Sequence, residues 1–487
     1  MVSEDPRRIG HWYLSLLRPP RVSLAALAII AGSVAQAGPS QNPPTLPAGT
    51  VQDESMRQGG TADALREQAS PPPNEGPGPF ERQPGFHLFP TEPARMMPYL
   101  AQANLYNSDC LKEGAVFEHD PLSEAAQAVK TALASIGINY ALWQSYTFAG
   151  QTGSVQGTRE VFNYYSANLY GTWAIFDSDE MGGTAGWLTL AASGGTGLGY
   201  DANDESPRAS AGTLGFPMGV DYGDQIFLFQ LAWQQSFLDG QLVVTAGYLD
   251  QENYMDLNTY ANNQYNQLQN YEFVTPSVFP ISFQSMGAVV QWQPVDWFYF
   301  MCCTAANNTQ PRQSPFEGVS LDNWTSVFEF GYVYEDLLGL GPGVFRAEPF
   351  YATVNGSGGA GLVFNVEQRL GKDLPFGFFA RAGWGNPNVT QLLGTQASFA
   401  GGLVLTGPTP TTFFKGEQAY LAGGFWWLES AQPATLGQSE YGFELTYVLQ
   451  LTPTLTLQPD LQVMIDPVNN PTSDAVVEMT VQLNMTW

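Results

Sequence analysis

The stretch VEMTVQLNMTW (residues 477–487) ends the chain and alternates strictly between apolar and polar side chains. Successive side chains of a β-strand point to opposite faces, so this stretch predicts a strand with one apolar and one polar face. The same alternation runs through residues 443–450 and 455–465, and through 324–334 and 362–369. Such strands are typical of transmembrane β-barrels, and soluble β-sandwiches show the pattern as well.

Composition favours the barrel over the sandwich. Charged residues make up 13% of the chain, about half of the usual share in soluble domains, and aromatic residues reach 13%. Aromatic clusters at 292–300 and 425–427 resemble the girdles at membrane interfaces, and include Trp292, Trp297, Phe298, Tyr299, Phe300, Phe425, Trp426 and Trp427. Residues 137–487 have room for about 16 strands, at roughly 22 residues for each strand with its connection. We therefore predict an all-β fold, a transmembrane antiparallel β-barrel of about 16 strands over 137–487.

The N-terminal third has a different organisation. An apolar run at residues 22–31 follows four arginines, and the small-x-small triplet 35–37 predicts a signal peptide over 1–37. Residues 38–98 are rich in proline and predict a flexible linker. Residues 99–136 are expected to form a short periplasmic or plug segment. Within it, 121–136 has the period of an amphipathic helix, with one apolar face made of Leu122, Ala125, Ala126, Val129, Leu133 and Ile136.

Charge and residue types exclude several function classes. Asp and Glu number 45 against 18 Lys and Arg, a net charge of -27, so a nucleic acid or an anionic surface is an unsuitable partner. His87 and His119 both precede the predicted barrel, which argues against a serine–histidine hydrolase. Cys110, Cys302 and Cys303 form no zinc or disulfide pattern, and we interpret the adjacent pair as buried strand thiols. We expect no enzyme activity, no cofactor and no metal site.

Charged residues on the polar faces of the predicted strands are the candidate pore-lining residues. An arginine facing lipid at the midplane of a barrel costs about 2–4 kcal/mol, so these side chains are expected to point inward. Inside a narrow barrel they could bind the hydroxyl groups of a sugar and set the pore size, or they could pair with each other to hold the wall together. The candidates are Arg346, Glu348, Glu367, Arg369, Arg381, Glu444 and Asp460.

Four stretches resemble a known family: LASIGINYALWQSYTFAG (133–150), SFLDGQLVVTAGYLDQENYM (236–255), LPFGFFARAGWG (374–385) and YGFELTYVLQLTPTLTLQPDLQVMIDPVNNP (441–471). From about residue 132 to the end, the sequence is similar to the carbohydrate-selective outer-membrane porins of the OprB type. The resemblance implies a sixteen-stranded barrel that passes monosaccharides. The chain departs from the family after Leu405, where TGPTPTTFFKG replaces a Gly-Arg-x-x-Asp element, and at Trp487, where phenylalanine is usual. No selectivity residue can be carried over by motif.

The expected function is therefore passive diffusion of monosaccharides such as glucose, and of other small solutes, through an outer-membrane porin. The expected partners are the lipid bilayer, small neutral sugars, and the barrel-insertion machinery that reads the last strand with Trp487; the barrel could also form a homotrimer. Two alternatives remain open. The chain could be a general porin that prefers cations, or a structural outer-membrane barrel tethered to a periplasmic partner.

Overall fold

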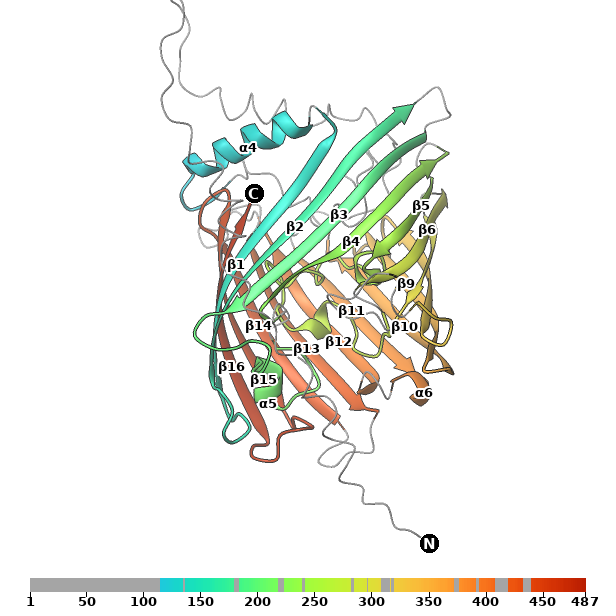
Figure 1. Ribbon diagram of the computed structural model, residues 1–487. Helices are drawn as coiled ribbons and strands as arrows, with labels where there is room; N and C mark the ends of the chain where they lie inside the picture. Colours follow the sequence, from blue (N-terminus) through green and yellow to red (C-terminus); the bar gives the residue numbers. More distant parts are fainter. Residues whose placement is uncertain are drawn as a thin grey trace, which may run out of the picture. The chain divides into compact units, whose positions relative to one another are not determined.

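The computed structural model describes residues 114–487, apart from 135, 179–183, 218–222, 239–240, 282–283, 296, 308–315, 317–318, 372–375, 391–393, 408–418 and 432–438 (Figure 1). The predicted signal peptide, the proline-rich linker and Cys110 lie outside these residues. None of the helices in the described part is long and apolar enough to cross a membrane.

Sixteen antiparallel strands in the described residues form one closed barrel (Figure 1). Each strand pairs with its neighbour in sequence, and β1 closes the barrel on β16. The prediction of a barrel of about 16 antiparallel strands is confirmed. The strands are β1 (Ile138–Thr152), β2 (Val161–Ser178), β3 (Thr184–Gly197), β4 (Gln225–Phe237), β5 (Leu242–Leu249), β6 (Ser285–Val295), β7 (Phe298–Ala306), β8 (Trp324–Tyr334), β9 (Gly343–Val354), β10 (Ser357–Arg369), β11 (Phe376–Gly385), β12 (Thr395–Thr406), β13 (Tyr420–Ser430), β14 (Ser439–Gln450), β15 (Leu455–Ile465) and β16 (Ala475–Thr486).

The alternation read from the sequence separates the two faces of the wall. In β16, Met479 is 64% exposed on the outer face, whereas its neighbours Glu478 and Thr480 are buried on the inner face. The opposite faces of successive residues follow from the pleat of an extended strand. The outer face is therefore apolar, and the inner face carries the polar side chains.

Three residues differ from the expectations that the sequence raised. Tyr299 and Trp426 belong to the predicted aromatic girdles, but both side chains point inward and are buried. Cys302 and Cys303 are both free, yet only Cys303 is buried, while Cys302 keeps intermediate exposure. The reason in each case is strand parity, because adjacent residues of one strand cannot share a face.

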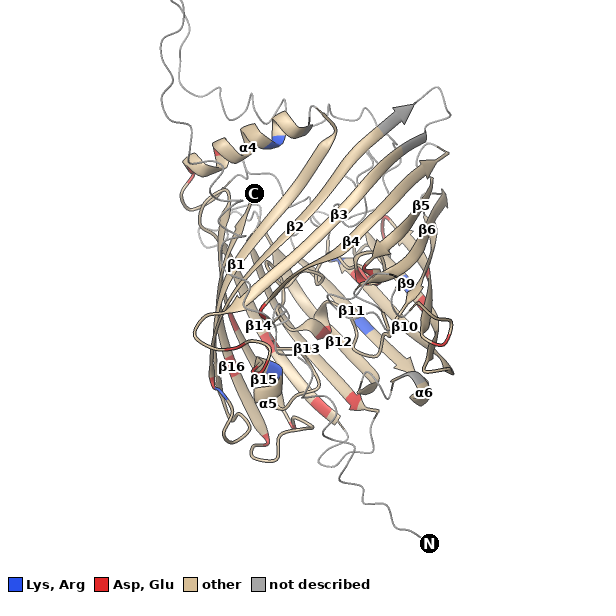
Figure 2. Cartoon of the chain, viewed as in Figure 1, with Lys and Arg blue, Asp and Glu red and all other residues tan. Residues whose placement is uncertain are grey.

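Charged residues are unevenly distributed around the wall. Strands β1–β7 contain a single charged residue, Asp177, and the front strands β1–β4 are almost uniformly tan in Figure 2. The remaining strands carry all the other charges. They are Glu329, Arg346, Glu348, Glu367, Arg369, Arg381, Glu429, Glu440, Glu444, Asp460 and Glu478. One side of the barrel is thus a neutral wall and the other a charged one.

Two long connections and two short helices complete the described fold. The β3–β4 connection contains helix α5 (Pro207–Ala211), and the β5–β6 connection contains the 3-10 turns η4 (Gln251–Asn253) and η5 (Tyr271–Phe273). Helix α6 (Pro387–Thr390) precedes β12. Helix α4 (Pro121–Ala134) lies at the rim where β1 begins and β16 ends (Figure 1).

The chain terminus takes part in closing the barrel. Trp487 donates its backbone N–H to the carbonyl oxygen of Leu142 at 2.9 Å, and Leu142 donates back to the Trp487 carbonyl at 3.0 Å. These two bonds extend the ladder between β1 and β16 by one residue. Trp487 therefore terminates the seam at which the barrel closes.

Replacing Trp487 with aspartate is expected to lower the amount of folded barrel in the outer membrane. The carboxylate would place a charge at the outer, apolar end of the closing seam. The measurement is the heat-modifiable band in outer-membrane fractions, with Trp487→Phe as the control that keeps an aromatic ring. Equal amounts of the aspartate and phenylalanine variants would show that the terminal ring has no role in assembly.

Candidate functional site

The β5–β6 connection folds into the barrel, and its residues 250–281 are called the inner segment here. This stretch contains ten Asn and Gln residues and no glycine. Its two short turns begin at polar caps, because Asp250 accepts the N–H of Glu252 at 3.0 Å and Asn270 accepts that of Glu272 at 3.1 Å. The apolar side chains of Tyr254, Met255, Leu268 and Phe273 are almost completely buried. The inner segment is therefore packed against the wall.

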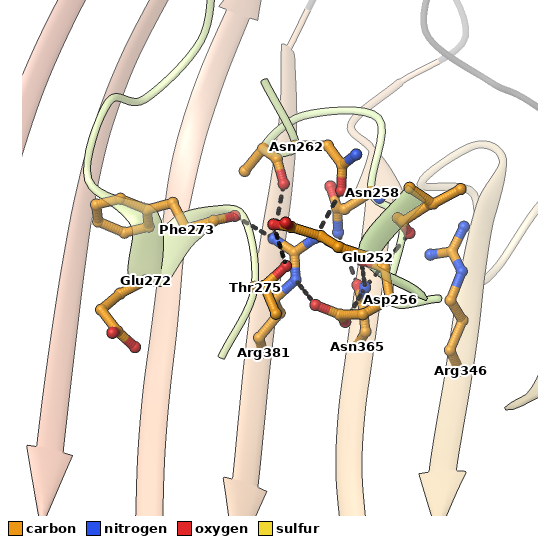
Figure 3. Close-up of polar contacts among 12 residues, drawn as sticks. Glu252, Asp256, Asn258, Asn262, Glu272, Phe273, Thr275, Arg346, Asn365 and Arg381 are labelled. Carbon is orange, nitrogen blue, oxygen red and sulfur yellow. Dashed lines mark hydrogen bonds and ion pairs between the residues drawn. The ribbon is translucent and has the colours of Figure 1, made fainter. Parts of the chain in front are cut away.

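Arg381 of β11 binds three separate parts of the inner segment (Figure 3). Its Nη1 donates to the carbonyl oxygen of Ala261 at 2.7 Å and to that of Phe273, and its Nη2 donates to the carbonyl of Asp256 at 2.8 Å. The Nε of Arg381 lies 2.8 Å from the Asp256 carboxylate, and both side chains have no exposed surface. The forked guanidinium, with its five N–H donors, suits this arrangement.

Arg346 of β9 forms a second ion-pair group beside the first. Its Nη2 lies 2.7 Å from Glu367 of β10, and its Nε donates to the hydroxyl of Tyr299 at 2.8 Å. Glu329 of β8 accepts the hydrogen bond of the Tyr299 hydroxyl and lies 3.6 Å from the Arg346 Nε. Glu329 also accepts the N–H of Asp256 at 3.1 Å, which connects this group to Arg381.

Wall carboxylates hold the backbone of the inner segment at two further points. Glu367 accepts the N–H of Thr259 at 2.5 Å. Four strands further along the charged side, Glu444 of β14 accepts the N–H groups of Gln269 and Asn270, the latter at 2.9 Å. Hydrogen bonds from charged acceptors to backbone N–H groups are stronger than neutral ones. The inner segment is thus fastened at separate points along the charged side of the barrel, from β10 to β14.

A third carboxylate, Glu440, fastens the β3–β4 connection. Its oxygens accept the hydroxyl of Thr213 at 2.6 Å, the N–H groups of Leu214 and Gly215 at 2.8 Å each, and that of Val468 at 3.2 Å. The two inward connections also touch each other, since the N–H of Tyr271 donates to the carbonyl of Phe216 at 2.9 Å. The lumen therefore contains two linked pieces of chain.

The structure brings most of the candidate pore residues to the inner face, but not to one place. Arg346, Glu367 and Arg381 belong to the network just described, and Glu348 is buried beside it with neither carboxylate oxygen hydrogen-bonded to a described residue. Glu444 lies further along the charged side with Asp460 of β15, whose Oδ1 accepts the side-chain amide of Gln462 at 3.0 Å. Arg369 is the last residue of β10, at the rim, where its N–H donates to Pro342 at 2.9 Å.

Sequence reasoning missed the partners of these charges. Asp256 lies in a connection between strands, where no strand pattern indicates its direction. Glu440 could not be distinguished from the other carboxylates in strands. Tyr299 was assigned to an aromatic girdle on the outer face. One signal could have indicated the inner segment: a connection of more than thirty residues that is dense in amides and free of glycine is too long for a tight turn.

Burial raises the pKa of Glu272, a residue of the inner segment, to about 8. Its Oε2 accepts the N–H of Ser277 at 3.2 Å, whereas its Oε1 has no hydrogen-bond partner among the described residues. A carboxyl group with a pKa of about 8 is mostly protonated, and therefore uncharged, at pH 7. Burial likewise raises the pKa of Asp256 to about 7, although the Arg381 guanidinium acts in the opposite direction.

Raising the pH from 6 to 9 is therefore expected to loosen the inner segment. The folded-state pKa of Glu272 is above the unfolded one, so its contribution to stability is complete below about pH 4 and is lost as the pH rises through about 8. The loss is at most about 1.4 kcal/mol per pH unit. Hydrogen exchange of 250–281 measures it, and Glu272→Gln should weaken the dependence. The same pH dependence in both proteins would contradict this assignment.

The model of one known protein family matches part of the chain. Residues 320–487 match the family model described as carbohydrate-selective porin, OprB family. The resemblance to the OprB family is confirmed. No curated protein matches the chain significantly.

A solved porin structure has the same fold as this chain. The high-pH structure of Pseudomonas putida OprB aligns with a TM-score of 0.60 at 16% identity, covering 77% of this chain and 100% of that one. The low-pH structure of the same protein has a TM-score of 0.44 at 16% identity, with coverage of 74% and 96%. A mutant of the Rh. blastica porin has a TM-score of 0.46 at 9% identity, with coverage of 72% and 100%. The first of these likenesses establishes the shared porin fold.

Proposed function

We propose that this protein is an outer-membrane porin through which small neutral carbohydrates, monosaccharides in particular, diffuse passively. The observation that carries the proposal is the chemistry of the inner segment. Nine of the ten residues that keep intermediate exposure there are neutral and polar, and the tenth is Glu252. The nine are Asn253, Thr259, Asn262, Asn263, Gln264, Asn266, Gln267, Tyr271 and Ser277.

Amide and hydroxyl groups suit a sugar because they both donate and accept hydrogen bonds without selecting for charge. Glu252 accepts hydrogen bonds from Tyr271 and Thr275, and burial raises its pKa. The surface that a solute meets on the inner segment is thus mainly neutral.

The charged residues have a positioning role in this proposal. Arg346, Glu367 and Arg381 are buried and fix the inner segment, as Glu444 does on β14. Arg369 is the last residue of β10 and keeps intermediate exposure. The match to carbohydrate-selective porins over the charged wall, 320–487, supports the choice of sugars as solutes.

Liposome swelling and single-channel recording test the proposal. Glucose is expected to enter faster than gluconate, and added glucose is expected to reduce the ion current. The double variant Gln264→Leu and Asn266→Leu keeps side-chain size but removes the hydrogen bonds, so the sugar effect should fall several-fold. Asn388→Leu, in an exposed part of α6, is the matched control.

Three results would overturn the proposal. A strong preference for small cations with no effect of glucose would favour a general cation porin, which the net charge of -27 makes physically reasonable. A barrel with no conductance would favour a structural protein. An unchanged glucose effect in the double variant would show that the amides of the inner segment do not contact the solute.

A further inference from the structure

A helix on the surface of a protein in water normally packs its apolar face against the protein and exposes its polar face. Helix α4 does the reverse. The residues buried against the barrel are Ser123, Ala126 and Gln127. Leu122 and Val129 are 54% and 52% exposed, and Ile136, just after the helix, is 62% exposed. Most of the apolar face that the sequence predicts therefore points away from the protein, whereas Ala126 is buried and Leu133 keeps intermediate exposure.

Both ends of this helix are fixed to the rim of the barrel. Before the helix, the N–H of Phe117 donates to the carbonyl of Leu451 at 2.8 Å. At its start, the Asp120 carboxylate accepts the hydroxyls of Thr452 and Thr454 at 2.9 and 2.6 Å. These partners belong to the turn between β14 and β15, whereas the other end of the helix leads directly into β1. The helix consequently runs along the rim with a defined orientation.

The contact of Lys130 shows on which side of the wall the helix lies. Its Nζ donates to the carbonyl of Tyr140 at 2.9 Å and lies 5.0 Å from the centre of the Tyr140 ring. In β1 the buried, inward residues are Ala141 and Trp143, so Tyr140 has outward parity. The side chain of Lys130 therefore contacts the outer side of the wall at the rim.

We propose that α4 is an interfacial membrane helix whose apolar face lies in the lipid at the periplasmic edge of the barrel. We assign lipid as the partner of this face because the exposed apolar side chains of α4 adjoin the outer face of the wall, which is also apolar and exposed. Ser123 and Gln127 of the helix face the barrel rim, and Lys130 extends its ammonium group along the rim, as lysines do at interfaces. The exposed Val116 and Phe117 extend the apolar surface. This inference rests on the proposed function, which places the wall in a membrane.

Site-directed spin labelling of the full-length protein in phosphatidylcholine vesicles tests the inference. Labels are attached to Val129→Cys, to Glu124→Cys on the same helix and to Met479→Cys on the outer wall, after Cys110, Cys302 and Cys303 are replaced by serine. Oxygen, which partitions into lipid, and a water-soluble nickel chelate compete to relax each label. The ratio of oxygen to nickel accessibility is expected to be several-fold higher at Val129 than at Glu124, and close to that at Met479.

The Met479 label separates failure of the inference from failure of the proposed function. A lipid-like ratio at Met479 together with a water-like ratio at Val129 would overturn the interfacial helix alone. Shielding of Val129 from both reagents would also overturn it, because another part of the protein or a second copy would then cover the face. A water-like ratio at both positions would overturn the membrane-embedded wall and the inference together.

Discussion

Replacing Arg381 with alanine is expected to release the inner segment from the wall and to increase single-channel conductance at least twofold. The guanidinium joins Asp256, Ala261 and Phe273, which lie far apart along the segment, and no part of it is exposed. Its removal leaves the buried Asp256 carboxylate without its cation, a change that costs about 3–5 kcal/mol. The barrel itself should persist, because the ladder of backbone hydrogen bonds around the wall does not involve this side chain.

Two further variants make the Arg381 experiment specific. Arg381→Lys keeps the charge but not the fork, so it should give an intermediate conductance and partial protection of 250–281 from protease. Arg369→Ala removes an arginine of β10 at the rim and should leave the conductance near that of the unmodified protein. If Arg381→Ala and Arg369→Ala behaved alike, with the inner segment still protected, the positioning role of Arg381 would be refuted.

Replacing Leu445 with arginine is expected to prevent most of the protein from forming a stable barrel in lipid. Leu445 lies in the middle of β14, opposite Gly423 and Leu461 of the neighbouring strands, and is 55% exposed on the outer face. An arginine facing lipid near the midplane costs about 2–4 kcal/mol. The fraction of heat-modifiable barrel after refolding into vesicles measures the effect.

Leu445→Ala is the control, since it shortens the side chain without adding charge and should retain most of the folded barrel. The difference between the two variants should shrink when the protein is refolded in detergent, where the charged end can reach water. Equal yields of the arginine and alanine variants in vesicles would mean that this face of β14 does not contact lipid.

The alternation of residues determined most of the wall. The apolar parity of 477–487 placed Met479 outside and Glu478 inside, because a strand has a side-chain period of two whatever surrounds it. The same rule placed Arg346, Glu367 and Arg381 on the inner face, since charge on the outer face is costly in lipid. The number of strands followed from the length of the chain and the length of a strand that crosses a bilayer.

Only the tertiary structure decided what those inward charges do. Arg381 binds the backbone carbonyls of Ala261 and Phe273, and Glu440 binds backbone N–H groups of two connections. Every residue has a backbone carbonyl, and every residue except proline has an N–H, so the sequence contains no sign of which ones an arginine or a carboxylate of the wall will bind. The direction of α4 was undetermined for a related reason. Its period established an apolar face over Leu122 and Val129, but whether that face meets protein or lipid depends on the barrel beside it.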